Sequence, residues 1–174
     1  MKYTRFEDLP VWQDAIRLAE DLFVLTEDKS FRFKGDIANQ IQRAALSVSN
    51  NTAEGFERGT TQELIAFLYY ARGSAGEVRS ILCLIERMEA FAHLKSQIPN
   101  LKSLAESISR QLRAWADQLQ NSDIKGQRHL TDRSQAIYRQ DRQAQTFVER
   151  MKDQHEKRLQ EIIAKRKKDG SAPA

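Results

Sequence analysis

Polar side chains recur at helical spacing in two stretches near the middle of the chain. Residues three or four positions apart lie on the same face of a helix, so each stretch would present its polar groups together. The first stretch comprises Gln40, Arg43, Ser47, Asn51 and Glu54. The second places Arg72, Ser74 and Glu77 around two glycines, Gly73 and Gly76. Hydrogen bonding between two helices is the chemistry that these residue types favour.

The two glycines bear on how this chemistry is used. A glycine inside a helix costs about 1 kcal/mol relative to alanine, so close packing against another backbone or a ligand should compensate. We therefore predict a partly buried hydrogen-bonded network that fixes the register of two helices. A ligand or partner site at the same residues stays open as the alternative. The predicted structural polar network comprises Arg43, Ser47, Asn51, Glu54, Arg72, Ser74 and Glu77.

Patterns for catalysis or metal binding are missing from the sequence. Di-metal bundles use inward-facing Glu-x-x-His pairs, but His93 follows Glu89 by four positions, and His129 and His155 lie far along the chain. The single Cys83 lies in an apolar run, which favours a small buried side chain over a thiolate ligand. There is neither a phosphate-binding glycine loop nor a nucleophile elbow. We expect no catalytic residues, no metal, no cofactor and no enzymatic activity.

Basic residues gather in the last third of the chain. Residues 1–120 hold 15 Lys and Arg against 16 Asp and Glu, whereas residues 121–174 hold 13 against 8. Clustered Lys and Arg contact nucleic-acid phosphates without reading bases, and Tyr138 would be a stacking residue. The candidate nucleic-acid contacts are Arg128, Arg133, Arg139, Arg142, Arg150, Lys152, Lys157, Arg158, Lys165, Arg166, Lys167 and Lys168.

The same stretch has a simpler interpretation that stays open. Carboxylates at helical spacing would pair with these cations and leave a merely solvated helix. These carboxylates are Glu149, Asp153, Glu156 and Glu161. A thin apolar seam along the stretch would instead dock on a protein partner or on a neighbouring copy. The seam residues are Ile137, Ala144, Val148, Met151, Leu159 and Ile162.

The elements that position these residues are helices. Seven Gly and three Pro in 174 residues, with abundant Ala, Leu, Glu and Lys, indicate helix nearly throughout. Apolar periodicity and capping signals predict helices over about residues 11–27, 36–57, 60–92 and 99–120. Asp36 is the expected N-cap of the second, Thr60 and Glu63 form a capping box for the third, and Gly55 and Gly59 bracket the end of the second. Phe31 and Phe33 should cap the core.

Four such helices with short connections predict an all-α fold, an up-and-down antiparallel four-helix bundle over residues 1–120. Residues 121–129 read as a linker, and residues 130–174 as a basic tail containing a further charged helix over about 131–168. With neither a signal peptide nor a stretch of about 20 apolar residues, we expect a cytoplasmic protein with no membrane association.

Two motifs carry a family resemblance. Residues 40–55, QIQRAALSVSNNTAEG, and residues 67–77, FLYYARGSAGE, closely resemble the four-helix bundle proteins encoded in intervening sequences of bacterial 23S rRNA genes. Phe6, Leu9, Val11 and Trp12 agree with this family as well. Thr52 stands where the family usually has Ile. The resemblance covers about residues 5–120, so it says nothing about the tail.

The resemblance implies a bundle that assembles into a homopentamer with a basic surface suspected of binding nucleic acid. The accessory variability determinant proteins of diversity-generating retroelements look like relatives, and they assist a reverse transcriptase. We therefore predict a non-enzymatic, homo-oligomeric accessory protein that binds RNA or DNA, RNA in the first place, with a reverse transcriptase as partner. A protein-interaction scaffold with no direct nucleic-acid role is the alternative.

Overall fold

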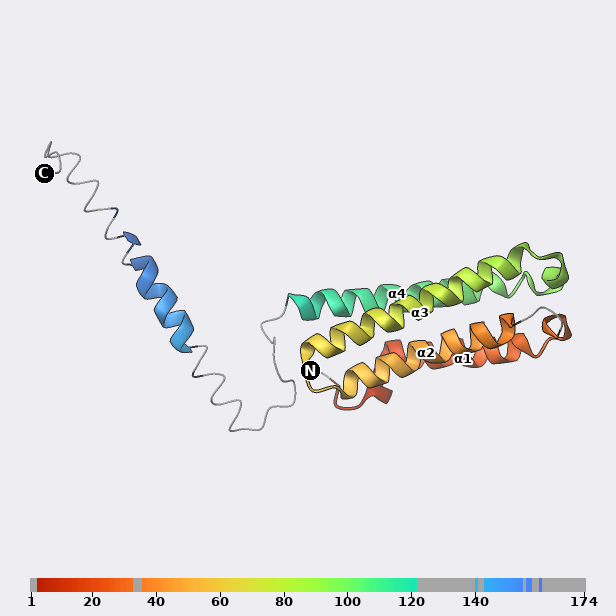
Figure 1. The fold of residues 1–174 in the computed structure, drawn as a ribbon, viewed down its shortest axis with the longest axis horizontal. Coiled ribbons are helices and arrows are strands. Elements are labelled where there is room, and N and C mark those ends of the chain that lie inside the picture. Colours follow the sequence, from red (N-terminus) through yellow and green to blue (C-terminus); the bar gives the residue numbers. More distant parts are fainter. Residues whose placement is uncertain are drawn as a thin grey trace, which may run out of the picture. The chain divides into compact units, whose positions relative to one another are not determined.

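The computed structural model describes residues 3–32, 36–121, 140, 143–154, 156, 157 and 160. The chain separates into two units, Met1–Arg128 and His129–Ala174. The first unit holds four long helices, α1 (Pro10–Thr26), α2 (Ile37–Glu57), α3 (Thr61–Arg87) and α4 (Ile98–Gln120), as Figure 1 shows. Three short 3-10 helices, η1 (Phe6–Asp8), η2 (Lys29–Phe31) and η3 (Glu89–Leu94), lie between or before them. The described residues are all-α, as predicted.

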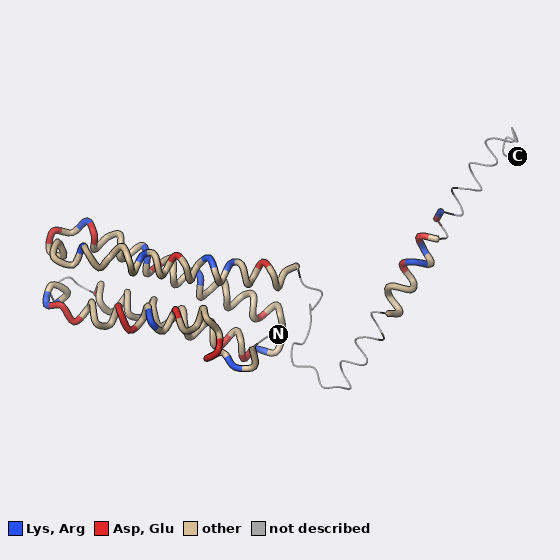
Figure 2. Tube along the Cα trace, turned by 180° about the vertical axis from the view of Figure 1, so that it is seen from behind, with Lys and Arg blue, Asp and Glu red and all other residues tan. Residues whose placement is uncertain are grey.

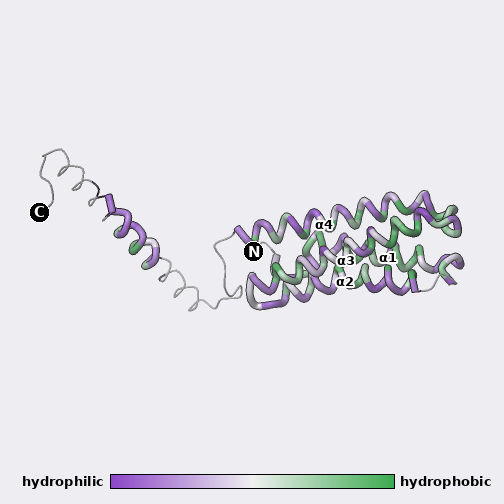
Figure 3. The backbone as a smooth tube through the Cα atoms, turned by 45° about the horizontal axis from the view of Figure 1, so that its top comes forward, coloured by the Kyte–Doolittle hydropathy of each residue, from purple (hydrophilic) through white to green (hydrophobic). Residues whose placement is uncertain are grey.

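Each long helix packs against two others. α1 contacts α2 and α4, and α3 contacts the same two helices, which gives the predicted up-and-down four-helix bundle. The hydrophobic residues of the four helices turn toward one another (Figure 3). Fully buried Leu18, Ile41, Leu82 and Ile108 bring one large side chain from each helix into the core. Cys83, expected in this core, is only half-buried.

The sequence predicted N-terminal capping residues for α2 and α3. The Thr60 hydroxyl accepts a hydrogen bond from the Glu63 backbone N–H at 3.3 Å and donates one to the Glu63 carboxylate at 2.8 Å, so the capping box is confirmed. Asp36 occupies the N-cap position of α2, but its side chain makes no capping bond there. Its carboxylate instead accepts a hydrogen bond from the Asn39 side chain at 2.6 Å, which corrects the predicted cap.

The third helix is shorter than predicted. α3 ends at Arg87 rather than near residue 92, because Met88 takes an extended backbone conformation with φ −85° and ψ 127°. This break lets η3 bury Phe91 and Leu94 over the end of the bundle. The Phe91 ring lies 4.7 Å from the ring of Phe31, centroid to centroid, so Phe31 caps the core as predicted. Phe33 lies outside the described residues.

The second unit is described by itself. Residues 143–154 form a helix whose side chains are all exposed, and residues 140, 156, 157 and 160 are helical too. Phe147, Val148 and Met151 are the large apolar residues here, with exposed fractions of 64%, 50% and 51%. The predicted additional charged helix is therefore present where the tail is described. Within the described residues, no helix is long and apolar enough to cross a membrane.

Candidate nucleic-acid interface and polar network

A short chain of hydrogen bonds joins α2 to α3. The Asn51 side-chain amide donates to the Ser47 carbonyl at 2.7 Å and to the Ser47 hydroxyl at 2.9 Å. The hydroxyls of Ser47 and Ser74 lie 2.8 Å apart, and the Ser74 hydroxyl donates to the Tyr70 carbonyl at 3.1 Å. The Ser74 hydroxyl donates its one proton to the Tyr70 carbonyl, so the Ser47 hydroxyl is the donor in the bond between the two serines. The hydrogen bonds therefore run in one direction, from the Asn51 amide to the Tyr70 carbonyl. This contact fixes the register of the two helices.

The predicted network is smaller than expected. Only Ser47, Asn51 and Ser74 of its seven residues are joined. Arg43 pairs with Asp36 at 3.5 Å. Glu54 pairs with Arg58 one turn along the same helix at 2.5 Å. Within the part of the chain that the structure describes, neither Arg72 nor Glu77 has a hydrogen bond or ion pair, so these four residues are removed from the network.

The reason is where the side chains lie on their helices. The Arg43 and Glu54 side chains are 72% and 50% exposed. A long charged side chain at such a position stays in water or pairs locally, because crossing to another helix would cost desolvation for little Coulomb energy. Short Ser and Asn side chains nearer the contact between α2 and α3 reach across it. The identity of the polar residues gave no sign of this difference in depth.

Gly55 makes the closest approach between α2 and α3. A Cβ atom built at Gly55 would lie 2.6 Å from the Phe67 Cβ and 3.2 Å from the Leu64 Cδ1. Real Cβ atoms do not approach so closely, so no residue with a side chain can take this position without moving a helix. Gly55 and Gly59 were predicted to bracket the end of the second helix, and α2 does end between them, at Glu57. The packing role of Gly55 against Phe67 was not predicted.

Residues around Phe67 form a cluster that the sequence analysis missed. The Arg58 guanidinium lies 5.1 Å from the centre of the Phe67 ring. It also pairs with Glu54 at 2.5 Å and Glu63 at 3.7 Å. The hydrogen bond that Arg58 donates to the Glu54 carboxylate raises the pKa of Arg58, so Arg58 keeps its charge. The edge of Phe67 meets Tyr70 at 5.6 Å between ring centres. Arg58 follows Glu54 by four residues, a spacing that would have predicted this ion pair.

Gly73 and Gly76 contrast with Gly55. A Cβ atom at either position would meet no atom within 4 Å. Both residues are exposed in α3, and no neighbouring helix of the bundle packs on them. The predicted close approach of another backbone is therefore wrong within the described bundle. The usual cost of a helical glycine stands here without an intramolecular contact to offset it.

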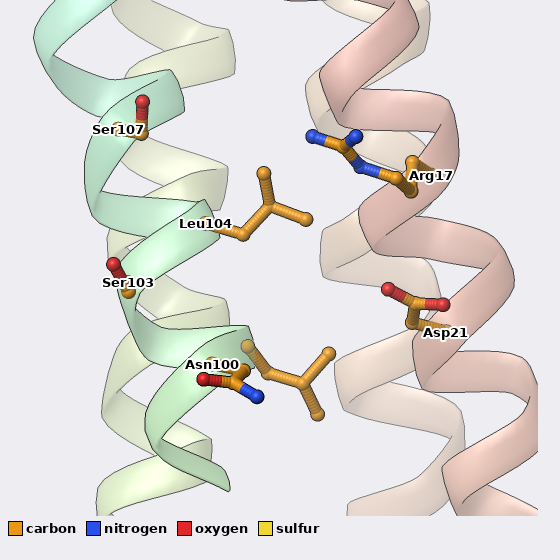
Figure 4. Close-up of a pocket in the computed structure, with 7 residues that line it drawn as sticks. Arg17, Asp21, Asn100, Ser103, Leu104 and Ser107 are labelled. Atoms are coloured by element: carbon orange, nitrogen blue, oxygen red, sulfur yellow. The ribbon is translucent and has the colours of Figure 1, made fainter. Parts of the chain in front are cut away.

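A groove of about 350 Å³ lies between α1 and α4. Arg17 and Asp21 of α1 lie across from Leu104 of α4 (Figure 4), and Asn100, Ser103 and Ser107 of α4 also line the groove. Arg17 is already paired with Asp14 at 2.7 Å. The lining residues include no histidine or cysteine and no pair of carboxylates, and no hydrogen bond joins either lining serine to Asp21. This groove adds no catalytic candidate.

Of the three histidines, His93 lies in the described part of the chain and contacts a carboxylate. The His93 Nε2 lies 3.1 Å from an Asp28 carboxylate oxygen, where it links η3 to the N-cap residue of η2. The Ser30 backbone and side chain, with His93, lower the pKa of Asp28 to about 2. His129 and His155 lie outside the described residues. Among the residues described, no group of three His, Cys, Asp or Glu side chains is arranged to hold a metal ion.

Three of the twelve predicted nucleic-acid contacts are in the described part of the tail. Arg150, Lys152 and Lys157 are helical and exposed. No carboxylate among the described residues forms an ion pair with them, although Glu149, Asp153 and Glu156 are close in sequence. The remaining contacts, together with Tyr138 and Glu161, lie outside the described residues: Arg128, Arg133, Arg139, Arg142, Arg158, Lys165, Arg166, Lys167 and Lys168.

The bundle has a different charge pattern. Lys and Arg alternate with Asp and Glu along its helices (Figure 2). Many of these residues are paired across one turn or between helices, as in Arg110 with Glu106 at 3.0 Å and Lys102 with Glu86 at 2.9 Å. Along the described helices of the bundle, positive and negative residues are therefore interspersed.

The comparison with known families covers the bundle. The family model of the 23S rRNA-intervening sequence protein matches residues 7–114. The chain belongs to this family. The match includes the Ser47–Ser74 contact and Gly55, and it ends before the basic tail. No curated protein matches the chain.

Proposed function

We propose that this family member is a non-enzymatic accessory protein that binds nucleic acid, RNA in the first place, through its C-terminal helix. The observation that supports this is the set of exposed cations at Arg150, Lys152 and Lys157, none of them paired with a described carboxylate. Exposed cations of this kind are available for contacts to nucleic-acid phosphates. The tail as a whole adds to the attraction, since residues 121–174 hold 13 Lys and Arg against 8 Asp and Glu.

The proposal includes a cytoplasmic homo-oligomer, a pentamer by the family resemblance. Several copies of a basic tail on one particle would engage one RNA at once, so a weak contact would gain avidity. The partner protein in this proposal is a reverse transcriptase of a diversity-generating retroelement. A reverse transcriptase gene beside the gene for this chain, with a template repeat, would support that partner; its absence would leave RNA binding to stand alone.

The test is binding of the full chain to a structured RNA across a salt series. The triple variant Arg150→Gln, Lys152→Gln, Lys157→Gln should bind more weakly. If all three residues contact phosphates, the slope of log K against log salt should fall by about 2 to 3. A control with the same loss of charge, Lys29→Gln, Arg87→Gln, Lys95→Gln, changes three exposed cations of the bundle and should leave the slope as it was. No binding at low salt would remove the proposal.

A second candidate is a protein-interaction scaffold, and the exposed apolar residues of the tail favour it. Phe147, Val148 and Met151 lie at steps of one, three and four on a helix, and each is at least half exposed. A helix of this kind docks its apolar stripe in a groove of another protein. Replacing Phe147 and Met151 with Ser separates the two functions, because the scaffold would lose its partner while phosphate contacts would persist.

A further inference from the structure

Phe147 is the most exposed aromatic residue in the part of the chain that the structure describes, with an exposed fraction of 64%. It lies on the helix over residues 143–154, whose side chains are all exposed. A phenyl ring in water is unfavourable, and its free energy falls when a flat apolar surface covers it. The groups around Phe147 indicate what that surface is.

The neighbours of Phe147 on its own face of the helix are mostly polar. Gln143 precedes it by four residues, Arg150 follows it by three, and Gln154 follows it by seven. These steps place the side chains on one face of a helix. A glutamine amide both donates and accepts hydrogen bonds, and an arginine keeps its positive charge. The ring is therefore flanked by two amides and a cation.

The carboxylates of the same segment stand on other sides of the helix. Glu149 follows Phe147 by two residues, and Asp153 follows Met151 by two. Residues two positions apart on a helix do not face each other. Between residues 143 and 154, the face that carries Phe147 and Arg150 therefore has a positive charge and no negative one, which suits an anionic ligand.

We propose that Phe147 stacks on an unpaired base of a single-stranded nucleic acid, RNA in the first place, while Arg150 contacts a phosphate of the same strand. The amides of Gln143 and Gln154 hydrogen-bond to base edges on either side of the ring. In a double helix the base faces already stack on one another, so a phenyl ring would meet only base edges and backbone. The inference rests on the proposed function and narrows its ligand to unpaired nucleotides.

A groove on another protein fits this face less well. A helix that docks in a groove places apolar side chains at positions i, i+3, i+4 and i+7. Counted from Phe147, the last three positions hold Arg150, Met151 and Gln154, of which only Met151 is apolar. Burying this face in an apolar groove would remove a guanidinium and an amide from water without partners. A nucleotide strand supplies a base for the ring, polar edges for the amides and phosphates for the cation.

The test compares binding of the full chain to an unstructured single-stranded RNA and to the same RNA annealed to its complement, at low salt. Phe147→Leu keeps an apolar side chain but has no ring, so it should bind the single strand at least about fivefold more weakly. Its binding to the duplex should stay as in wild type. Leucine has the higher helix propensity, so loss of the helix cannot cause the weakening.

Two further variants serve as controls. Phe147→Tyr keeps an aromatic ring and should bind the single strand as wild type does. Phe23→Leu makes the same chemical change at an exposed phenylalanine of α1 and should leave binding unchanged. Arg150 and Lys152 are intact in all of these variants, so phosphate contacts persist and binding by Phe147→Leu is weakened rather than abolished.

A second measurement detects the stack itself. Phe147→Trp places an indole at the proposed contact, and its fluorescence should be quenched by the single strand and not by the duplex. Trp12 and Trp115 give the background signal, which is measured in wild type and subtracted.

Each possible result decides between the two proposals. Single-strand binding by Phe147→Leu that equals wild type would overturn the stacking proposal and leave RNA binding by the cations standing, and the ring would then be free to serve a protein partner. Equal weakening on single strand and duplex, or an unquenched indole, would overturn it too. Failure of wild type to bind either form at low salt would overturn both proposals.

Discussion

Gly55 and the pair Gly73 and Gly76 belong to neighbouring helices of one bundle, but their surroundings are opposite. At Gly55 the backbones of α2 and α3 are so close that a Cβ atom would lie 2.6 Å from the Phe67 Cβ. At Gly73 and Gly76 a Cβ atom would meet nothing within 4 Å. Every one of the three glycines costs helix stability, but within the described residues only Gly55 gains a close packing contact in return.

The difference separates residues that hold the bundle from residues that face outward. Between the same two helices that meet at Gly55, the short polar side chains of Ser47 and Ser74 are bonded at 2.8 Å. Around Gly73 and Gly76, the side chains of Arg72 and Glu77 have no partner among the described residues, and Tyr69 and Tyr70 are exposed. Both regions carry the polar and small residues that suggested one network, so residue type alone did not distinguish a packing role from a surface role.

The largest expected effect is at Gly55. We predict that Gly55→Ala lowers the free energy of unfolding by about 3 kcal/mol, because the added methyl group forces two packed helices apart. Thermal and urea unfolding followed by circular dichroism would measure the change. Adding Phe67→Leu should not rescue the variant, since the Cβ atom that blocks the methyl group is still present. A loss below about 0.5 kcal/mol would show that the helices separate easily and would break the comparison.

The serine pair should give the next largest effect. Ser47→Ala removes the hydroxyl that donates to Ser74 and accepts from Asn51, and we expect a loss of about 1 kcal/mol in unfolding free energy. Ser74→Ala should cost a similar amount. In a double-mutant cycle the combined variant should cost less than the sum, because both single changes break the same bond. Strict additivity would show that the two hydroxyls contribute independently of their 2.8 Å contact.

Much of this architecture could be predicted from residues at fixed spacing. Local rules of periodicity and capping predict the apolar positions of the four helices, the Thr60 capping box and the core role of Phe31. The structure confirms all three predictions. The Ser47–Ser74 contact could be predicted as well, because both residues lie on the sides where α2 and α3 face each other.

The distances between residues of different helices could not be predicted from the sequence. Gly55 was assigned only a role near the end of the second helix, because glycine commonly ends helices, and the position of Phe67 shows that packing requires a glycine there as well. Gly73 and Gly76 looked like packing residues for the same general reason, although nothing in the described bundle approaches them. The C-terminal end of α3 was predicted several residues beyond its actual position, because Met88 is not a residue that commonly ends helices. The helix stops there because the chain turns to bury Phe91 and Leu94.

Alanine substitution at the two exposed glycines should increase stability, whereas the same substitution at Gly55 should decrease it. We predict that Gly73→Ala and Gly76→Ala each raise the unfolding free energy by about 0.5 to 1 kcal/mol, because alanine has the higher helix propensity and its methyl group has space. The measurement belongs at a protein concentration where the mass is that of one chain. Destabilisation at that concentration would show that the α3 face packs against part of its own chain.

The smallest effect on a single chain is expected at the unpaired charges. Arg72→Ala and Glu77→Ala should change the unfolding free energy by less than about 0.5 kcal/mol in dilute protein, since neither residue has a partner among the described residues. Concentrated protein should behave differently. If copies associate through the α3 face, the melting temperature of wild type rises with concentration, whereas that of Arg72→Ala rises less. Equal concentration dependence in the two proteins would place the contact between copies on another face and leave Arg72 a solvated surface residue.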